Sequence, residues 1–446
     1  MPGRRRRRSP VSTRTAPPER GLRRLRALAL LGPAFVAAIA YVDPGNVAAN
    51  LTAGAEFGYL LVWVLVMANA MAVLVQYLSA KLGVVTGRSL PEVLADRMSR
   101  RGRIAYWLQA EGVAMATDLA EVIGGAIALN LLFGVPLVVG GLITGAVSMV
   151  VLAVQQRRGQ RIFETVLLTM LGVITVGFCA GLLAAPPDAG AVLGGLVPRF
   201  EGTDSVLLAA SMLGATVMPH AIYLHSSLAR DRVRHDAARR AAIAGATPSD
   251  VATAAGAAPS DPSAVRRLLR ATRWDVVAAL IIAGGVNIAM LLLAAANLPG
   301  RTGTDTIEGA YAAISDSLGP LVAVLFGVGL LTSGLASTAV GAYAGSEIMA
   351  GLLRVRVPLL TRRLVTLVPA LLLLATDISP TYLLVLSQVV LSFGIPFAMI
   401  PLVRVTRDAG LLGEFRNGRP MQVVAWAVAA VIVGLNVTLL WLTIAN

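Results

Sequence analysis

Charged side chains are scarce in this sequence: Asp, Glu, Lys and Arg make up only 14% of its 446 residues. Soluble globular proteins carry roughly 25% charged residues, so the shortage excludes an ordinary soluble domain. Cysteine is almost absent, since Cys179 is the only one. A single cysteine excludes an intramolecular disulfide framework and any site that binds a metal through several thiolates.

The motifs of hydrolytic enzymes are missing as well. The apolar runs contain no His-Glu-x-x-His motif and no Gly-x-Ser-x-Gly elbow. A membrane-embedded hydrolase, which needs a nucleophile with its base or a zinc motif, is therefore a poor interpretation. We expect that the chain is not an enzyme and has no cofactor.

What the sequence does contain is a series of long apolar runs, with 56% hydrophobic residues overall. A helix needs about 20 mainly apolar residues to cross a hydrocarbon core roughly 30 Å thick. The pattern predicts an all-α membrane protein with eleven transmembrane helices, at 28–55, 59–83, 104–132, 135–154, 162–185, 205–228, 274–297, 319–345, 358–376, 379–403 and 421–444.

Arginines lie mainly in alternate connections between these runs. The formal charge of +14 is typical of proteins that bind nucleic acid or acidic surfaces. Here the topology explains it: with the N-terminus inside, all five inward loops are basic and the outward loops hold only Arg199 and Arg301. Because cytoplasmic loops carry the excess of Arg and Lys, we predict a multi-pass protein of the cell membrane. Its N-terminus is cytoplasmic, its C-terminus is outside, and nucleic acid is not a partner.

Two segments outside the spans need their own interpretation. Residues 1–27 are rich in arginine and imitate the charged start of a signal peptide, but we expect a disordered basic cytoplasmic tail. Residues 229–272 form the longest connection, and their basic ends and Ala-rich centre predict a flexible cytoplasmic loop.

The first span is interrupted near its middle by Asp43-Pro44-Gly45-Asn46. Proline removes a helical donor and disfavours helical geometry at the residue before it, and glycine permits almost any backbone angle. An ordinary turn between two spans does not fit, because the two pieces are too short to cross separately. We therefore predict one helix that unwinds at mid-membrane.

The sixth span repeats this feature at Ala215-Thr216-Val217-Met218-Pro219-His220, where a simple proline kink is the alternative. Interruptions five spans apart predict two five-helix repeats. Discontinuous helices in inverted repeats indicate a transporter's binding site. The predicted units are a first repeat at 28–185, an external loop with helix six at 186–228, helices seven to ten at 274–403, and a cytoplasmic loop with helix eleven at 404–446.

The two interruptions offer ligands for a cation. Asp43 supplies a carboxylate and Asn46 an amide oxygen, while Met218 supplies a thioether and Ala215 a freed carbonyl. Oxygen ligands alone suit magnesium or calcium, whereas a thioether favours softer transition metals. A buried methionine that only packs in the core is the alternative for Met218.

Both interruptions resemble the paired signatures of the Nramp family of proton-coupled Mn²⁺/Fe²⁺ transporters. The resemblance covers nearly all eleven spans and includes residues 116–121 and 387–392. It implies a LeuT-type 5+5 inverted repeat plus one extra helix, and import by alternating access. It also implies metal ligation by Asp43, Asn46, Met218 and the Ala215 carbonyl, with Gln388 joining in one conformation. The substrate would be Mn²⁺ or Fe²⁺, with Cd²⁺ and Co²⁺ also accepted, and no obligate protein partner is expected.

Helix three carries three acidic residues, Glu111, Asp118 and Glu121, on a stripe about 80° wide that rises about 15 Å. Ionisable groups inside spans are costly and face a cavity or one another. Glu111 could instead sit at the interface, and Asp118 and Glu121 could form structural salt bridges with Arg362 and Arg363. The family pattern supports that pairing and assigns the network to proton passage.

His220 follows the sixth-span interruption. The unperturbed pKa of histidine, near 6.5, suits a proton carrier, and a structural hydrogen-bond donor is the alternative. His225 lies about 140° around the same helix, so we expect it to face elsewhere. The proposed route runs from Asp43 through the helix-three carboxylates to the cytoplasm. The nearest rival function, a Na⁺-coupled amino-acid symporter, fits less well, because an acidic Asp43 and a thioether suit a dication better than a zwitterion.

Overall fold

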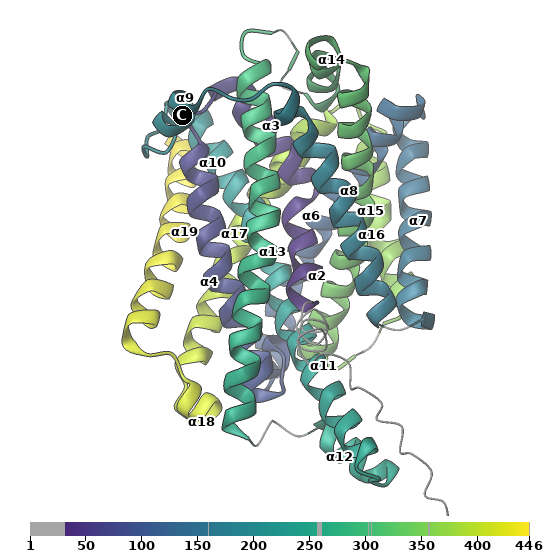
Figure 1. Ribbon diagram of the computed structural model, residues 1–446, viewed down its shortest axis with the longest axis vertical. Helices are drawn as coiled ribbons and strands as arrows, with labels where there is room; N and C mark the ends of the chain where they lie inside the picture. The colour runs from purple at the N-terminus through teal and green to yellow at the C-terminus, as the bar shows by residue number, and fades with distance from the viewer. Residues whose placement is uncertain are drawn as a thin grey trace, which may run out of the picture.

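The computed structural model describes residues 32–158, 160–256, 261–301, 303–304, 306–355 and 357–445. In these residues every regular element is a helix. Figure 1 shows the long helices running side by side along one axis. Eight helices in the described part are long and apolar enough to cross a membrane. The prediction of an all-α integral membrane protein is therefore confirmed, while the predicted tail at 1–27 lies outside the described residues.

The helices follow one another with short connections. The long ones are α4 (Val62–Thr86), α6 (Arg100–Phe133), α7 (Leu137–Arg158), α8 (Gln160–Ala184), α13 (Pro262–Asn297), α15 (Pro320–Leu353), α16 (Leu359–Leu374), α17 (Pro380–Arg407) and α19 (Arg419–Ala445). The interrupted ones are α2 (Pro33–Ile39), η1 (Ala40–Val42) and α3 (Pro44–Phe57), and then α10 (Gly202–Thr216) and α11 (Pro219–Ile243). The short ones are α5 (Leu90–Arg97), α9 (Ala189–Gly194), α12 (Pro248–Gly256), α14 (Ile307–Leu318), α18 (Ala409–Leu412) and η2 (Gly413–Phe415).

Three of the eleven predicted spans are not among the eight long apolar helices. The range 28–55 is described only from Gly32 and is interrupted at Asp43. Within α7, the described residues Leu137–Ala153 form a shorter apolar helix, and α16 has 16 residues. A count of eleven spans therefore stays a prediction.

The segment 229–272, predicted to be a flexible loop, is mostly helical in its described residues. Helix α11 continues to Ile243, α12 covers Pro248–Gly256, and α13 already begins at Pro262. The prediction of a loop was wrong because alanine and arginine are both strong helix formers, and a polar surface does not prevent a helix from forming. Asp261 caps α13 by accepting a hydrogen bond from the Ser263 N–H at 2.8 Å, with Pro262 in the first turn.

The two ends of the bundle differ. Figure 1 shows α12 and α18 at one end, and α9, α14 and the C-terminus at the other. Between these ends, α3 and α10 pack against each other, although they are far apart in sequence, and both pack against α17. Helix α6 packs against α15, α7, α16 and α17. This packing brings both interruptions next to α17, and it places the acidic helix α6 beside α3.

Candidate metal site

The first interruption is a local consequence of Asp43 and Pro44. Helix α2 tightens into the 3₁₀ turn η1, and Asp43 then adopts an extended backbone with φ −82° and ψ 167°. Its side chain caps α3, because Oδ1 accepts a hydrogen bond from the Asn46 N–H at 2.8 Å. Pro44 occupies the first turn of α3, where a missing N–H has no cost.

Backbone carbonyls left free by this interruption find partners on neighbouring helices. Asn287 of α13 donates from Nδ2 to the Tyr41 carbonyl at 2.7 Å. Ser333 of α15 donates from its hydroxyl to the Val42 carbonyl at 2.5 Å. Buried carbonyls need hydrogen-bond donors, and these two contacts supply them and hold the turn in place.

The second interruption follows from Pro219. Helix α10 ends at Thr216, Val217 has φ −107° and ψ 59°, and Met218 is extended with φ −62° and ψ 126° before α11 begins. Proline has no N–H, so the carbonyl of Ala215, four residues earlier, has no helical donor. Asn46 supplies one instead, donating from Nδ2 to the Ala215 carbonyl at 3.0 Å.

The two interruptions therefore meet, together with one residue of α17. Asn46 Nδ2 also donates to Asp43 Oδ1 at 2.8 Å, and Gln388 Nε2 lies 3.4 Å from Asp43 Oδ2. A Cβ atom at Gly45 would overlap the Gln388 side chain, so only glycine permits this approach. We call Asp43, Asn46, Ala215, Met218 and Gln388 the break site; all five are fully buried. For Met218 the structure shows this burial and its place at the start of α11.

The break site has acceptor atoms in excess. The side-chain oxygens Asn46 Oδ1 and Gln388 Oε1 are buried and have no hydrogen-bond partner within the described part of the chain. In the same part, Asp43 forms no salt bridge and is contacted by amide groups only. Among the five residues of the break site, Asp43 is the only one with an ionisable side chain. A buried carboxylate beside unpartnered amide oxygens can hold a cation.

The acidic stripe of α6 is paired differently. Arg362 Nη2 lies 2.8 Å from Glu111 Oε1, and Arg363 Nη1 lies 3.2 Å from Asp118 Oδ1. We call Glu111, Asp118, Glu121 and these two arginines the charge ladder. The sequence offered both arginines as partners of Asp118 and Glu121; in the structure Arg363 lies against Asp118 and Arg362 against Glu111. Adjacent residues on a helix point about 100° apart, so the two arginines reach different acids.

Glu121 is the member of the charge ladder that lies nearest the break site. It is buried, its Oε2 has no hydrogen-bond partner among the described residues, and it packs against Gly341 of α15. One turn further along α6, Gly124 lies against the ring of Pro44, and a Cβ atom there would overlap the ring. Close packing of α6 on the first interruption therefore places Glu121 near the break site.

The two histidines have different neighbours, as the helical spacing predicts. His220 Nδ1 lies 3.3 Å from Thr117 Oγ1 of α6, so His220 connects the second interruption to the charge ladder. His225 Nδ1 lies 2.8 Å from Gln76 Oε1 of α4, and Gln76 Nε2 donates to the Tyr41 hydroxyl at 2.5 Å.

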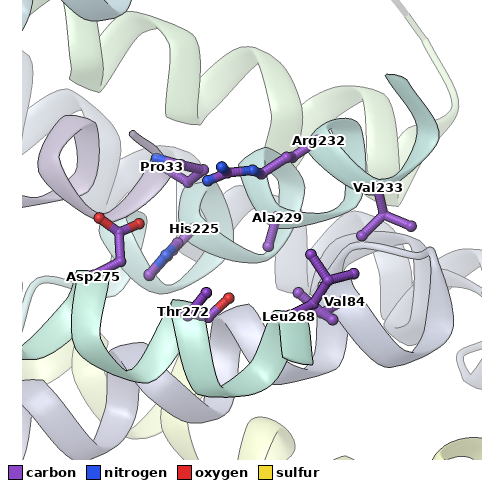
Figure 2. Close-up of a pocket in the computed structure, with 10 residues that line it drawn as sticks. Pro33, Val84, His225, Ala229, Arg232, Val233, Leu268, Thr272 and Asp275 are labelled. Carbon is purple, nitrogen blue, oxygen red and sulfur yellow. The ribbon is translucent and has the colours of Figure 1, made fainter. Parts of the chain in front are cut away.

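Beside His225 lies a small cavity that was not predicted from the sequence. Figure 2 shows His225, Arg232 and Asp275 around it, next to Pro33, and its volume is about 20 Å³. Asp275 Oδ2 accepts a hydrogen bond from the Ala34 N–H at 3.3 Å, which ties the start of α2 to α13. An acidic residue at the start of a predicted span was the signal that could have identified Asp275.

Ion pairs tie the α12 end of the bundle together. Arg230 of α11 contacts Glu92 of α5 at 2.9 Å, Asp231 at 2.7 Å and Glu347 of α15 at 2.8 Å. The opposite side of the break site carries a groove of about 330 Å³ formed by α3, α10 and α17. Its polar lining residues are Thr52, Glu56, Asp204, Ser379, Thr381 and Tyr382. The same three helices carry Asp43, Asn46, Ala215 and Gln388 of the break site, while Met218 begins α11.

Comparison with known proteins places this geometry in a family. The family described as natural resistance-associated macrophage protein-like (Nramp) matches residues 34–442. A relative in Mycobacterium tuberculosis (strain CDC 1551 / Oshkosh), named divalent metal cation transporter MntH, is 60% identical over 415 residues, which cover 93% of this chain and 92% of the relative.

Solved structures agree in fold. A manganese transporter of Eremococcus coleocola matches with a TM-score of 0.79 and 30% identity, over 95% of this chain and 88% of its own. The nucleobase-cation-symport-1 transporter MHP1 matches with a TM-score of 0.55 at 19% identity over 93% of this chain and 90% of its own, which shows a LeuT-type fold alone. The relatives are named as transporters, in agreement with the prediction that the chain is not an enzyme. The chain belongs to the Nramp family of integral membrane proteins, as its two interrupted helices predicted.

Proposed function

We propose that this chain is a proton-coupled symporter that imports divalent transition-metal ions, Mn²⁺ and Fe²⁺ with Cd²⁺ and Co²⁺ as further substrates, across the cell membrane by alternating access. The observation that carries the proposal is the break site, where the Asp43 carboxylate lies beside the unpartnered oxygens of Asn46 and Gln388. The names of its relatives, a divalent metal cation transporter and a manganese transporter, support the same substrate class.

The ligand set favours a transition metal. Asn46 Nδ2 now bridges Asp43 Oδ1 and the Ala215 carbonyl. If the Asn46 amide rotated by half a turn, its Oδ1 would take the place of Nδ2. Asp43 Oδ1, the Ala215 carbonyl and Asn46 Oδ1 would then present three oxygens to one point. Gln388 Oε1 adds a fourth oxygen, and Met218 adds a sulfur. Oxygen ligands alone would serve Mg²⁺ equally well, so the thioether gives the preference for softer dications.

Proton coupling follows from the short distance between the break site and the charge ladder. A cation that binds beside Asp43 favours its ionised form, so a proton held there is released. Glu121 is the nearest ladder carboxylate, one turn from the Pro44–Gly124 contact. From there Asp118 and Glu111 continue along α6, and His220 provides a second connection through Thr117. We infer that the proton leaves the break site along this series toward the arginine-rich end.

The membrane topology of the proposal has eleven spans. Helices one to five (28–185) and six to ten form two inverted repeats, with the first and sixth helices unwound at mid-membrane and helix eleven added. The end that carries α5, α12 and α18 would face the cytoplasm, because the arginine-rich connections lie there. The polar groove formed by α3, α10 and α17 would then receive the metal from outside.

Transport into sealed vesicles tests this function. The purified protein is placed in liposomes with a metal-quenched dye or a pH dye inside, and Mn²⁺ is added outside. We expect Mn²⁺ entry together with acidification, and neither signal should respond to a mixture of amino acids. Competition by amino acids would instead support a Na⁺-coupled symporter.

The variant Asp118→Asn separates coupling from binding. We expect it to abolish acidification while calorimetry still detects Mn²⁺ binding, because Asp118 lies outside the break site. Acidification at the rate of the unmodified protein would contradict the role of the charge ladder. Failure of Mn²⁺ to bind the unmodified protein would overturn the metal site itself.

A further inference from the structure

Helix α17 contains two internal prolines, Pro396 and Pro401. Each removes the N–H that would bond the carbonyl four residues earlier, at Ser392 and Phe397. Neighbouring helices satisfy both carbonyls. Asn436 of α19 donates from Nδ2 to the Ser392 carbonyl at 2.9 Å, and the Tyr106 hydroxyl of α6 donates to the Phe397 carbonyl.

Beside these prolines lies a groove of about 550 Å³ on the outer surface of the helices. Tyr106 lies at one edge of the groove. The walls are apolar side chains of α17 and α19, several of them more than half exposed, namely Phe393, Phe397, Ile400, Val433, Val437 and Leu440. The polar atoms that line it are engaged elsewhere, since Asn436 Oδ1 accepts from the Ser392 hydroxyl at 2.8 Å and the Tyr106 and Tyr223 hydroxyls lie 2.7 Å apart. The groove therefore suits an apolar occupant.

Two arginines lie just beyond one end of this groove. Arg404 follows Phe397 by seven residues, so it lies about 20° from it around α17 and about 10 Å nearer the helix end. Arg103 precedes Tyr106 by three residues on α6 and lies about one turn nearer the same end. Across the described ranges, neither arginine forms a salt bridge with a carboxylate. Positive charge thus lies at the end of an apolar groove.

We propose that this groove, together with Arg103 and Arg404, is a binding site for an anionic phospholipid. One acyl chain lies along the walls formed by α17 and α19, and the phosphate contacts the two guanidinium groups. Charge complementarity selects the occupant. An apolar molecule would not pair with the two arginines, and a soluble anion would not fill the apolar groove. Anionic headgroups are attracted to basic residues at the membrane surface.

The position of this lipid gives it a role in packing. Helix α17 carries Gln388 on its inner side and α6 carries the acidic stripe, while both face the groove on their outer side. A bound acyl chain would support the bent part of α17, where two helical hydrogen bonds are missing. The site does not depend on the proposed metal transport.

Native mass spectrometry of the full chain in detergent tests the proposal. Phosphatidylglycerol and phosphatidylcholine with identical acyl chains are added in turn. We expect phosphatidylglycerol to bind more tightly than phosphatidylcholine. The double variant Arg103→Gln/Arg404→Gln should weaken its binding about 25-fold, from about fivefold for each arginine. The control Arg239→Gln/Arg240→Gln removes two exposed arginines of α11 and should leave binding unchanged.

A second variant tests the groove without changing charge. Val437→Trp would fill it, and we expect phosphatidylglycerol binding to fall although both arginines remain. A thermal unfolding midpoint near that of the unmodified chain verifies folding; if this variant does not fold, the arginine variants decide. Equal binding of the two lipids, an unaffected arginine variant, or displacement by the soluble headgroup glycerophosphoglycerol at equal concentration would overturn the proposal.

Discussion

The break site and the charge ladder are both buried and polar, yet their charges are arranged in opposite ways. At the break site one carboxylate, Asp43, is contacted by amide groups only. In the ladder, Glu111 and Asp118 each face an arginine, and only Glu121 has no salt bridge in the described part of the chain. A buried charge without a counter-charge is costly, whereas a paired one is largely compensated. The first arrangement suits a cation that binds and leaves, and the second suits carboxylates that must stay in place while protons pass.

The largest effect should come from separating a ladder pair. Arg363 and Asp118 are both almost fully buried, so Arg363→Met leaves an uncompensated carboxylate. We expect a loss of about 3–5 kcal/mol in the free energy of unfolding. The measurement is denaturant titration in detergent. The double variant Asp118→Asn/Arg363→Met should regain part of the loss, because it removes the unpaired charge. Equal stability of the single and double variants would mean that the two side chains do not interact.

Removal of the carboxylate at the break site should leave folding intact but abolish transport. Asp43→Asn keeps the side-chain shape and one acceptor oxygen, yet it removes the negative charge that offsets a dication. We expect Mn²⁺ uptake into vesicles to fall at least about 100-fold, the upper range for the loss of a group that supports a metal site. Asp316→Asn, which removes an exposed carboxylate of α14 outside the groove, is the matched control and should cost little. Uptake within about threefold of the unmodified protein would show that the charge of Asp43 is not used.

Replacement of Met218, the proposed sulfur ligand, should change selectivity more than affinity. For Met218→Ala we expect about a tenfold loss in the preference for Cd²⁺ over Mg²⁺, because a soft ligand is removed and the oxygens remain. Calorimetry with Mn²⁺, Fe²⁺, Cd²⁺ and Mg²⁺ measures this ratio. Met212→Ala is the control, since Met212 is equally buried in α10 but lies outside the break site. A parallel loss in both variants would indicate that Met218 only packs in the core.

The sequence predicted the parts of the molecule that depend on local chemistry. Proline lacks a backbone N–H and disfavours helical geometry at the residue before it, so the motifs around Pro44 and Pro219 predicted both interruptions and the free carbonyl of Ala215. Most of the described residues in 229–272 are helical, because their alanine and arginine content favours a helix although the segment is long and polar.

Contacts between distant segments were harder to predict. The approach of Gln388 to Asp43 depends on the packing of α17 against α3 and on Gly45, which leaves room for it. The pairing of Arg362 with Glu111, 251 residues apart, depends on the relative rotation of α16 and α6. The capping of α2 by Asp275 depends on the approach of α13. No sequence spacing determines these three geometries, whereas each follows once the helices are placed.

The smallest effect should arise where the two regions are joined. His220 belongs to the second interruption and Thr117 to the ladder helix, and the contact between their side chains is a single one of 3.3 Å. Thr117→Val preserves the shape of the side chain and removes the hydroxyl, which also donates to the Val113 carbonyl of its own helix at 3.2 Å. The contact with His220 accounts for about 1 kcal/mol, as one hydrogen bond does. We expect the rate of proton flux to fall about fivefold, the equivalent of that energy, while the affinity for Mn²⁺ is unchanged. Thr144→Val is the control, because the Thr144 hydroxyl bonds the Gly140 carbonyl of its own helix at 2.9 Å. If Thr117→Val weakened Mn²⁺ binding and left proton flux intact, His220 would serve the break site rather than the ladder. Thr117 would then belong to the break site as well.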